Sequence, residues 1–297
     1  MKPTFTITQD QVAIAAARPV RVQHYRCPEA QDIGPHDHEY YEITVVRAGT
    51  SLHRTPFTET RIGPGSAIIL APGGVHEFIA PHALEVTNVY YLAEWLMDDL
   101  ASLWRQPGFV PLFLAHTLFQ DPATRHVPMG SLDATTMEAC MHELEDIVRE
   151  SQRNEPSLIV LRSALLKFLV TLSRSFEEEA PSRARSFRKE VWLALDRVEQ
   201  CIAQSEPFRV AELAREVGIS TDHLTRMFRH ATGRSPMEYY QRRRVQKAGR
   251  LLLEADREIT EIAHTLGYCD AAHFCKVFRR IQGRSPRDYR ATYGLHR

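Results

Sequence analysis

An internal repeat in the second half of the chain constrains its fold more than any other feature. Residues 213–240 read LAREVGISTDHLTRMFRHATGRSPMEYY, and residues 262–290 read IAHTLGYCDAAHFCKVFRRIQGRSPRDYR, with one extra residue in the turn. The shared residues are Ala214, Gly218, Phe228, Gly233, Ser235, Pro236 and Tyr239 in the first copy and Ala263, Gly267, Phe278, Gly283, Ser285, Pro286 and Tyr289 in the second. The small alanine permits close helix crossing, and the first glycine permits a tight turn. The sequence therefore predicts two helix-turn-helix units in an all-α C-terminal domain.

The end of each copy carries the signal for the start of a further helix. Ser235 and Glu238 have the spacing of a capping box, with proline at the first helical position. Ser285 and Asp288 repeat the pattern with a shorter carboxylate. A plain helical bundle accounts equally well for one such unit. Two copies that share Gly-Arg-Ser-Pro favour a pair of recognition modules.

The charge of the chain is divided between its two halves, although 37 Lys and Arg balance 37 Asp and Glu overall. From residue 181 onward there are 23 basic and 14 acidic residues, which leaves 14 and 23 for residues 1–180. A basic domain of this kind favours a polyanionic partner. We therefore expect the repeat-containing domain to bind double-stranded DNA.

The first half has a different pattern, in which short segments rich in β-branched and aromatic residues alternate with Pro and Gly. This predicts an antiparallel barrel or sandwich. From about residue 132 the apolar period becomes helical, with Met137, Met141, Leu144 and Val148 on one face. The expected fold class is α+β, with a barrel at 1–131, a helical segment at 132–179, a linker at 180–186 and the all-α domain at 187–297.

Composition limits the cellular setting. No apolar run reaches the length of a membrane span, and the N-terminus lacks a signal-peptide pattern. The five cysteines are scattered without a C-x-x-C pair, which suits reduced thiols. We expect a cytoplasmic protein with no membrane partner.

The stretch GPHDHEYYEI contains candidate ligands. On one β-strand, His36, His38 and Glu42 would share a face, because side chains alternate with a period of two. A neighbouring strand that begins after PGG would add His76. Three imidazoles and a carboxylate suit a catalytic metal ion, and they equally suit the wall of a pocket that senses a small molecule.

The C-terminal part, roughly residues 187–293, resembles the DNA-binding domain of AraC/XylS-type transcription regulators. The motif residues are Gly283, Ser285, Pro286, Tyr289 and Arg290, with Leu266, Gly267, Tyr268, His273, Phe274 and Phe278, and in the first copy Pro236, Tyr239, Arg244, Ala248, Leu251 and Leu252. The resemblance implies sequence-specific DNA binding, regulation of transcription as an activator or a repressor, and contact with RNA polymerase.

The N-terminal part resembles a cupin. Gly34, His36, His38, Glu42 and Gly49 are similar to the first cupin motif, and Gly63, Pro72, Gly74 and His76 are similar to the second. A small cupin-type barrel before two helix-turn-helix units is the architecture of sugar-responsive members of this family. The resemblance further implies that residues 132–176 are dimerisation helices, and hence a homodimer.

The second helix of each unit is expected to lie in a major groove of DNA. Because Leu224, Phe228, Phe274 and Phe278 are assigned to the core, the remaining faces carry the candidate contacts. These are Thr221, Asp222, Thr225, Arg226 and Arg229 in the first unit and Ala271, Ala272, His273, Lys276, Arg279 and Arg280 in the second. Arg226 is the strongest reader because its guanidinium pairs bidentately with guanine. His273 equally suits a packing role. In the joining helix, Arg242 and Arg243 are candidate phosphate contacts, and Arg244 is expected to be structural.

Two functions remain open. In the first, the barrel binds an effector, a sugar or related metabolite, and thereby changes how the basic domain engages DNA. In the second, the barrel is a metal-dependent cupin enzyme fused to a DNA-binding module, with His36, His38, Glu42 and His76 as ligands. A variant of the first is a regulator whose sensor site holds a metal ion at the same residues. The repeat favours the first, so we expect no enzyme activity, no cofactor and no resident metal. The effector contacts are then His36, His38, Tyr40, Glu42 and His76. Isolated histidines such as His53 are expected to have no part in the site.

Overall fold

The computed structural model describes residues 1–15, 18–29, 31–96, 103, 106, 108–114, 118, 127–176, 189–254 and 257–293. The chain divides into two compact units, residues 1–186 and 187–297. The linker predicted at 180–186 lies outside the described residues. None of the helices in the described ranges is long and apolar enough to cross a membrane.

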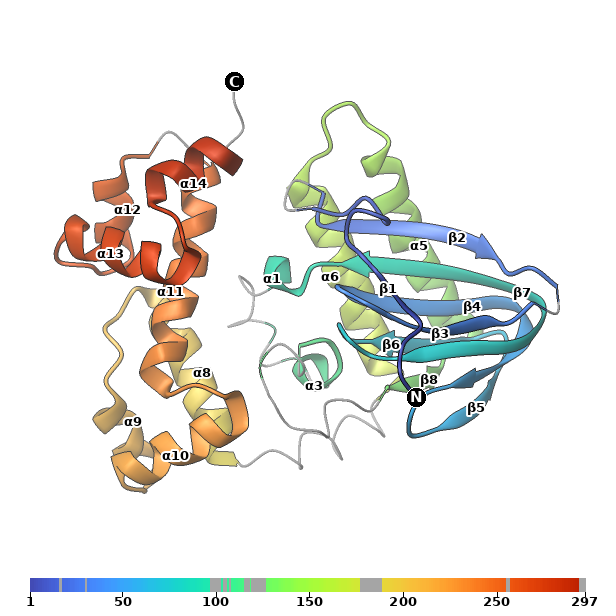
Figure 1. The fold of residues 1–297 in the computed structure, drawn as a ribbon, viewed down its shortest axis with the longest axis horizontal. Helices are drawn as coiled ribbons and strands as arrows, with labels where there is room; N and C mark the ends of the chain where they lie inside the picture. Colours follow the sequence, from blue (N-terminus) through green and yellow to red (C-terminus); the bar gives the residue numbers. More distant parts are fainter. Residues whose placement is uncertain are drawn as a thin grey trace. The chain divides into compact units, whose positions relative to one another are not determined.

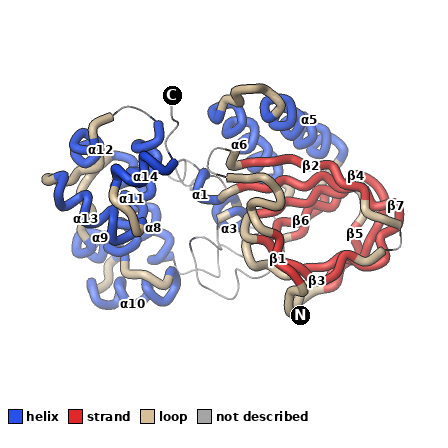
Figure 2. The backbone as a smooth tube through the Cα atoms, turned by 45° about the horizontal axis from the view of Figure 1, so that its top comes forward, coloured by secondary structure: helices blue, strands red, loops and turns tan. Residues whose placement is uncertain are grey.

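The first unit is built on a single sheet, whose strands curl around a common interior (Figure 1, Figure 2). The order is β1-β3-β7-β4-β6-β8, with β2 joined to β7 and β5 joined to β4. The strands are β1 (Phe5–Ile7), β2 (Val20–Arg26), β3 (Ile33–His38), β4 (Tyr41–Arg54), β5 (Glu59–Ile62), β6 (Ser66–Leu70), β7 (His76–Tyr91) and β8 (Met129–Ser131). The predicted β-rich first half is therefore confirmed.

The two long strands β4 and β7 are neighbours in the middle of the sheet. They pair antiparallel from Tyr41 opposite Tyr91 to Arg54 opposite Glu77, with register shifts near the middle. Gly49 lies in this irregular stretch with φ 75°, and a Cβ there would lie 2.1 Å from the carbonyl oxygen of Ala83. Only glycine fits such an approach, because any side chain would meet the opposing backbone.

Within its described ranges, the first unit contains the helices α1 (Ala93–Leu96), α3 (Phe109–Phe113), α5 (Ala134–Ser151) and α6 (Leu158–Arg174). α5 packs against α6 and β2. Asp133 caps α5 by accepting from the Thr136 amide. The stripe that α5 buries contains Cys140, Leu144 and Ile147. Of the four residues predicted to share one apolar face, Leu144 is fully buried, and Met137, Met141 and Val148 are partly buried.

The second unit is all-α, as the repeat predicts. Its helices are α8 (Lys189–Gln204), α9 (Val210–Val217), α10 (Thr221–Thr232), α11 (Pro236–Glu254), α12 (Ile259–Thr265), α13 (Ala271–Gln282) and α14 (Pro286–Tyr293). The long α11 joins the two repeats and contacts α8, α10, α12, α13 and α14. Together with the sheet of the first unit, these helices confirm the α+β fold class.

The local signals of the repeat have the expected geometry. Gly218 ends α9 with φ 77°, and Gly267 follows α12 with φ 74°, so both turns use the left-handed region. The Ser235 amide donates to Glu238 Oε2 at 2.7 Å, and the Glu238 amide donates to Ser235 Oγ at 3.3 Å. This reciprocal pair is the capping box that the sequence predicts.

A buried ion pair ties α8 to α11. The Arg243 guanidinium donates from Nε to Glu199 Oε1 at 2.7 Å and from Nη2 to Oε2 at 2.9 Å, and the hydroxyl of Tyr239 donates to Oε1 at 2.9 Å. Glu199 and Arg243 are buried. Arg243 therefore has a structural role, and its assignment as a phosphate contact is wrong. Arg242 is exposed, and Arg244 lies over the Tyr268 ring with its guanidinium carbon 3.7 Å from the centroid, in keeping with the structural role expected for it.

Candidate functional site: a buried histidine cluster and two exposed helices

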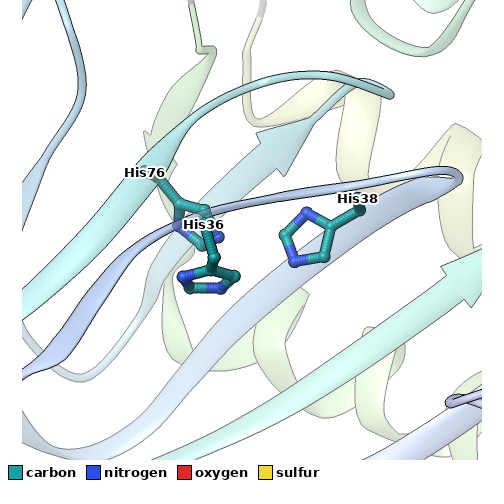
Figure 3. Close-up of side chains that lie close together, drawn as sticks. All are labelled: His36, His38 and His76. Carbon is teal, nitrogen blue, oxygen red and sulfur yellow. The ribbon is translucent and has the colours of Figure 1, made fainter. Parts of the chain in front are cut away.

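Strand pairing brings three histidines together inside the sheet of the first unit. His36 on β3 lies directly opposite His76 on β7, and His38 shares the face of His36 because it lies two residues further along β3. One ring nitrogen from each of the three lies within 4.8 Å of the others. Figure 3 shows the rings converging from two strands. All three are buried.

Glu42 reaches this cluster by a different route from the predicted one. β3 ends at His38, the chain bends, and Glu42 belongs to β4, so the three residues do not share one strand. Its Oε2 nevertheless lies 2.8 Å from His38 Nε2, and the Thr44 hydroxyl donates to Oε1 at 3.0 Å. Glu42 thus contacts His38 Nε2 and does not belong to the group of three convergent histidines.

His53 is the residue that the sequence reasoning missed. It lies opposite Phe78 in the β4–β7 pair, which makes it a diagonal neighbour of His76 on the same face. Its Nε2 lies 3.1 Å from His76 Nδ1, and the side chain is fully buried. The sequence signal for His53 was the alternation of inward and outward side chains, since Ser51, His53 and Thr55 are all buried whereas Leu52 is partly buried. This alternation is hard to recognise in the sequence because the inward-facing residues are polar.

Burial controls the charge of the cluster. Burial lowers the pKa of His36, of His76 and of His53, the last to about 4, so these rings are uncharged near pH 7. Burial opposes ionisation of Glu42, but the nearby His38 ring and the hydrogen bonds from His38 and Thr44 outweigh it and lower the pKa of Glu42. The interior therefore offers the neutral imidazoles of His36, His53 and His76 beside the carboxylate of Glu42.

Several polar atoms of the cluster are left with unused hydrogen-bonding capacity. His38 Nδ1, His53 Nδ1, His76 Nε2 and the hydroxyl of Tyr40 are buried and have no hydrogen-bond partner among the described residues. The Tyr40 ring lies 5.3 Å from that of His38, and burial raises the pKa of its hydroxyl. Buried polar atoms without partners are rare in proteins, so each needs an explanation, and a ligand that binds there is one. All five predicted effector contacts lie in this region: His36, His38, Tyr40, Glu42 and His76.

In the second unit, α10 presents the first set of predicted DNA contacts. Thr221, Asp222, Arg226 and Arg229 are exposed, and Thr225 is half-buried. The Ser220 hydroxyl caps the helix by accepting from the His223 amide. Arg229 Nη2 lies 3.6 Å from Glu238 Oε2, between two exposed side chains. Leu224 and Phe228 are buried on the opposite face, as expected.

The second set lies on α13, where Ala271, Ala272, Lys276 and Arg279 occupy the positions equivalent to Thr221, Asp222, Arg226 and Arg229. Ala272, His273, Lys276, Arg279 and Arg280 are exposed, whereas Ala271 is half-buried and packs against the core. Asp270 caps the helix by accepting from the Ala272 and His273 amides. Arg280 donates to Gln241 Oε1 at 2.9 Å. The His273 ring makes an edge contact with Tyr268 at 5.8 Å.

Comparison with known proteins assigns a family to each unit. Residues 19–169 match the family described as AraC-like ligand binding domain, and residues 213–292 match a helix-turn-helix domain family. The chain is similar to the HTH-type transcriptional activator RhaS of Klebsiella pneumoniae strain 342, with 28% identity over 86% of each chain. It is also similar to the HTH-type transcriptional activator RhaR of Mannheimia succiniciproducens, with 22% identity over 94% of each chain. A crystal structure of an AraC-type regulator from Chromobacterium violaceum matches 36% of this chain and 93% of its own, with 28% identity and a TM-score of 0.33.

Proposed function

Because the chain belongs to the family of AraC-type regulators with a cupin-like ligand-binding domain, we propose that it activates transcription under the control of a small molecule. The observation that carries the proposal is the pair of exposed helices α10 and α13, which present Arg226 and Lys276 at equivalent repeat positions. The similarity to transcriptional activators supports the same function. RNA polymerase is the further partner that activation requires.

Each of the two helices reads one segment of major groove. Two readers on one chain should cover successive segments about 34 Å apart, which is one turn of the duplex. Arg226 and Lys276 are placed for base edges, and Arg229 and Arg279 for phosphates. The neutral Ala272 suits apolar contact with a thymine methyl group.

Footprinting and binding measurements test the DNA assignment. Arg226→Ala should weaken binding to the preferred site by about 1–3 kcal/mol and relax the preference at one base pair. Arg229→Ala should weaken binding to all sequences alike and flatten its dependence on salt. Arg153→Ala is the matched control, because this exposed arginine belongs to the first unit. Protection of a single groove segment, or an Arg226→Ala variant with unchanged base preference, contradicts the assignment.

The effector is a sugar or related polar metabolite bound at the histidine cluster. The cluster combines neutral imidazoles, the carboxylate of Glu42 and the hydroxyl of Tyr40, which suit the alternating donors and acceptors of a polyol. A thermal-shift screen of metabolites should identify it, because a ligand that binds only the folded state raises Tm. His38→Ala should then abolish the effector response while DNA affinity without effector is retained. A full response in this variant would exclude the cluster as the effector site.

The chain acts as a homodimer through the helical segment at 132–179. Met141 and Val148 on α5 remain partly exposed, and Ile159 at the start of α6 is 79% exposed. Met141→Glu with Ile159→Glu should yield monomers in sedimentation, whereas Leu144→Glu is unsuitable because Leu144 is fully buried. A folded double variant that remains dimeric would move the interface elsewhere.

A further inference from the structure

We propose that Asp222 makes the first reading helix, α10, reject DNA that lacks a cytosine at one defined base pair. The second reading helix, α13, has Ala272 at the equivalent position and does not impose this requirement. The inference deepens the proposed function and rests on it, because it concerns which DNA sequences the chain binds once α10 lies in a major groove.

Asp222 lies at the centre of the exposed face of α10. A helix turns by about 100° per residue, so Asp222 and Arg226 lie one turn apart on the side opposite the buried Leu224 and Phe228. Both Asp222 and Arg226 are exposed. The N-terminal residues of a reading helix are those that contact base edges, and Asp222 belongs to the first turn of α10.

The carboxylate of Asp222 is available for such a contact. The cap of α10 is Ser220, whose hydroxyl accepts from a backbone amide of the same helix, so the cap does not use Asp222. Within the described residues, the side chains of Asp222 and Arg226 have no hydrogen-bond or ion-pair partner, and they do not pair with each other. The acidic residue at the start of α13 differs, because both carboxylate oxygens of Asp270 accept from amides of its own helix.

A free carboxylate in a major groove discriminates between bases. The phosphates of every DNA sequence repel it. Only an amino group on a base edge offsets this repulsion, because a carboxylate accepts hydrogen bonds and donates none. Cytosine presents the N4 amino group, adenine presents the N6 amino group beside the N7 acceptor, and guanine and thymine present acceptors. The expected order of preference is therefore cytosine, then adenine, then guanine and thymine.

The two reading helices differ in chemistry at the centre of their exposed faces. In α10, Asp222 requires a donor, and the fork of Arg226 pairs bidentately with guanine. In α13, Ala272 has no polar side-chain atom, and Lys276 is a flexible point charge that donates to acceptors of several bases. The DNA site should therefore be strictly specified in the segment that α10 reads and loosely specified in the segment that α13 reads.

Selection from a random duplex library with the full-length chain defines the preferred site. Fluorescence anisotropy then measures binding to that site, to its three variants at the selected cytosine, and to an unrelated duplex. Asp222→Asn removes the charge, and because asparagine pairs bidentately with adenine, the preference should move from cytosine to adenine. Affinity for the unrelated duplex should rise about 3–10-fold, since one repulsive charge is lost. The ratio of specific to unrelated affinity should fall at least about 10-fold.

Two further variants complete the design. Glu206→Gln is the matched control, because it removes one negative charge from an exposed residue of the same unit outside both reading helices. It should leave the base preference unchanged. Ala272→Asp is the reverse change, and it should introduce a cytosine preference in the segment read by α13 while weakening binding to the unrelated duplex. This variant also decides the question if Asp222→Asn does not fold.

The outcomes that overturn the proposal are distinct from those that overturn DNA binding itself. An Asp222→Asn variant with the base preference of the unaltered chain overturns the proposal, and so does one that binds the unrelated duplex more weakly. A lowered Tm as the only change would show that Asp222 merely stabilises the N-terminus of α10, and it would overturn the proposal too. Failure of the unaltered chain to enrich any sequence would overturn the proposed function before a variant is made.

Discussion

The two units bury polar clusters that differ in how completely their hydrogen bonds are met. In the second unit, both carboxylate oxygens of Glu199 accept hydrogen bonds, from Arg243 and Tyr239. We call this a closed cluster. In the first unit, the histidine cluster leaves His38 Nδ1 and His76 Nε2 without partners among the described residues. Both clusters are buried, so burial alone does not distinguish them.

This difference in hydrogen bonding distinguishes a cluster that stabilises the fold from one that can bind a ligand. A closed cluster gains nothing from a ligand and fixes the position of one helix against another, here α8 against α11. An open cluster costs free energy in the empty protein and recovers it when a ligand arrives. A basic residue inside a DNA-binding unit is therefore no guide to DNA contact, as Arg243 illustrates.

Breaking the closed cluster should have the largest effect. Arg243→Ala leaves Glu199 buried and unpaired, which should destabilise the second unit by about 3–5 kcal/mol. Urea unfolding followed by hydrogen–deuterium exchange in α8 and α11 measures this loss. Arg242→Ala is the control on the neighbouring exposed residue and should change stability by less than about 0.5 kcal/mol.

A double variant distinguishes the charge effect from a packing effect. Glu199→Leu with Arg243→Met removes both charges and keeps similar volume, so most of the lost stability should return. An Arg243→Ala loss below about 1 kcal/mol would show that the pair does not stabilise the helix contact, and the closed-cluster description would then fail.

Lowering the pH should destabilise the first unit, which contains the open histidine cluster, before it destabilises the second unit. The folded pKa of His53 is about 4 because burial disfavours its charged form, with Glu42 opposing and His36 reinforcing this effect. Below its ordinary pKa of about 6.5, the unfolded chain binds the proton first. The free energy of unfolding of the first unit therefore has its full value above about pH 6.5 and falls towards pH 4, by a total on the order of 1–3 kcal/mol.

Hydrogen exchange at a series of pH values separates the two units. Between pH 6.5 and 5, protection should fall in β4 and β7 more than in α10 and α13. The caps Glu238 and Asp270 have lowered pKa values because of backbone hydrogen bonds, so their contribution declines only below about pH 4. His53→Gln should weaken the pH dependence of the first unit. Equal loss in both units would contradict this assignment.

The smallest effects come from a matched pair of Tyr→Phe changes. Tyr239→Phe removes a donor to Glu199 and should cost about 1–2 kcal/mol. Tyr40→Phe removes a buried hydroxyl without a partner among the described residues and should be neutral or stabilising by up to about 1 kcal/mol. Thermal unfolding of the effector-free protein gives both values. Destabilisation of similar size in both variants would remove the distinction between open and closed clusters.

The sequence by itself determined the features that depend on neighbouring residues. The two helix-turn-helix units, the capping box at Ser235 and the left-handed turns at Gly218 and Gly267 all follow from contacts within a few residues. Alternation likewise places His36 and His38 on one face of a strand. Such signals survive without knowledge of the tertiary fold, because local geometry alone satisfies them.

Only the tertiary structure decided which distant residues meet. His53 joins the cluster through the register of β4 on β7, and Arg243 meets Glu199 because one face of α11 packs on α8. The partly exposed edge of α5 at Met141 likewise depends on how the helix rotates against α6 and β2. Register and helix rotation are set by packing summed over whole elements, so no short stretch of sequence encodes them.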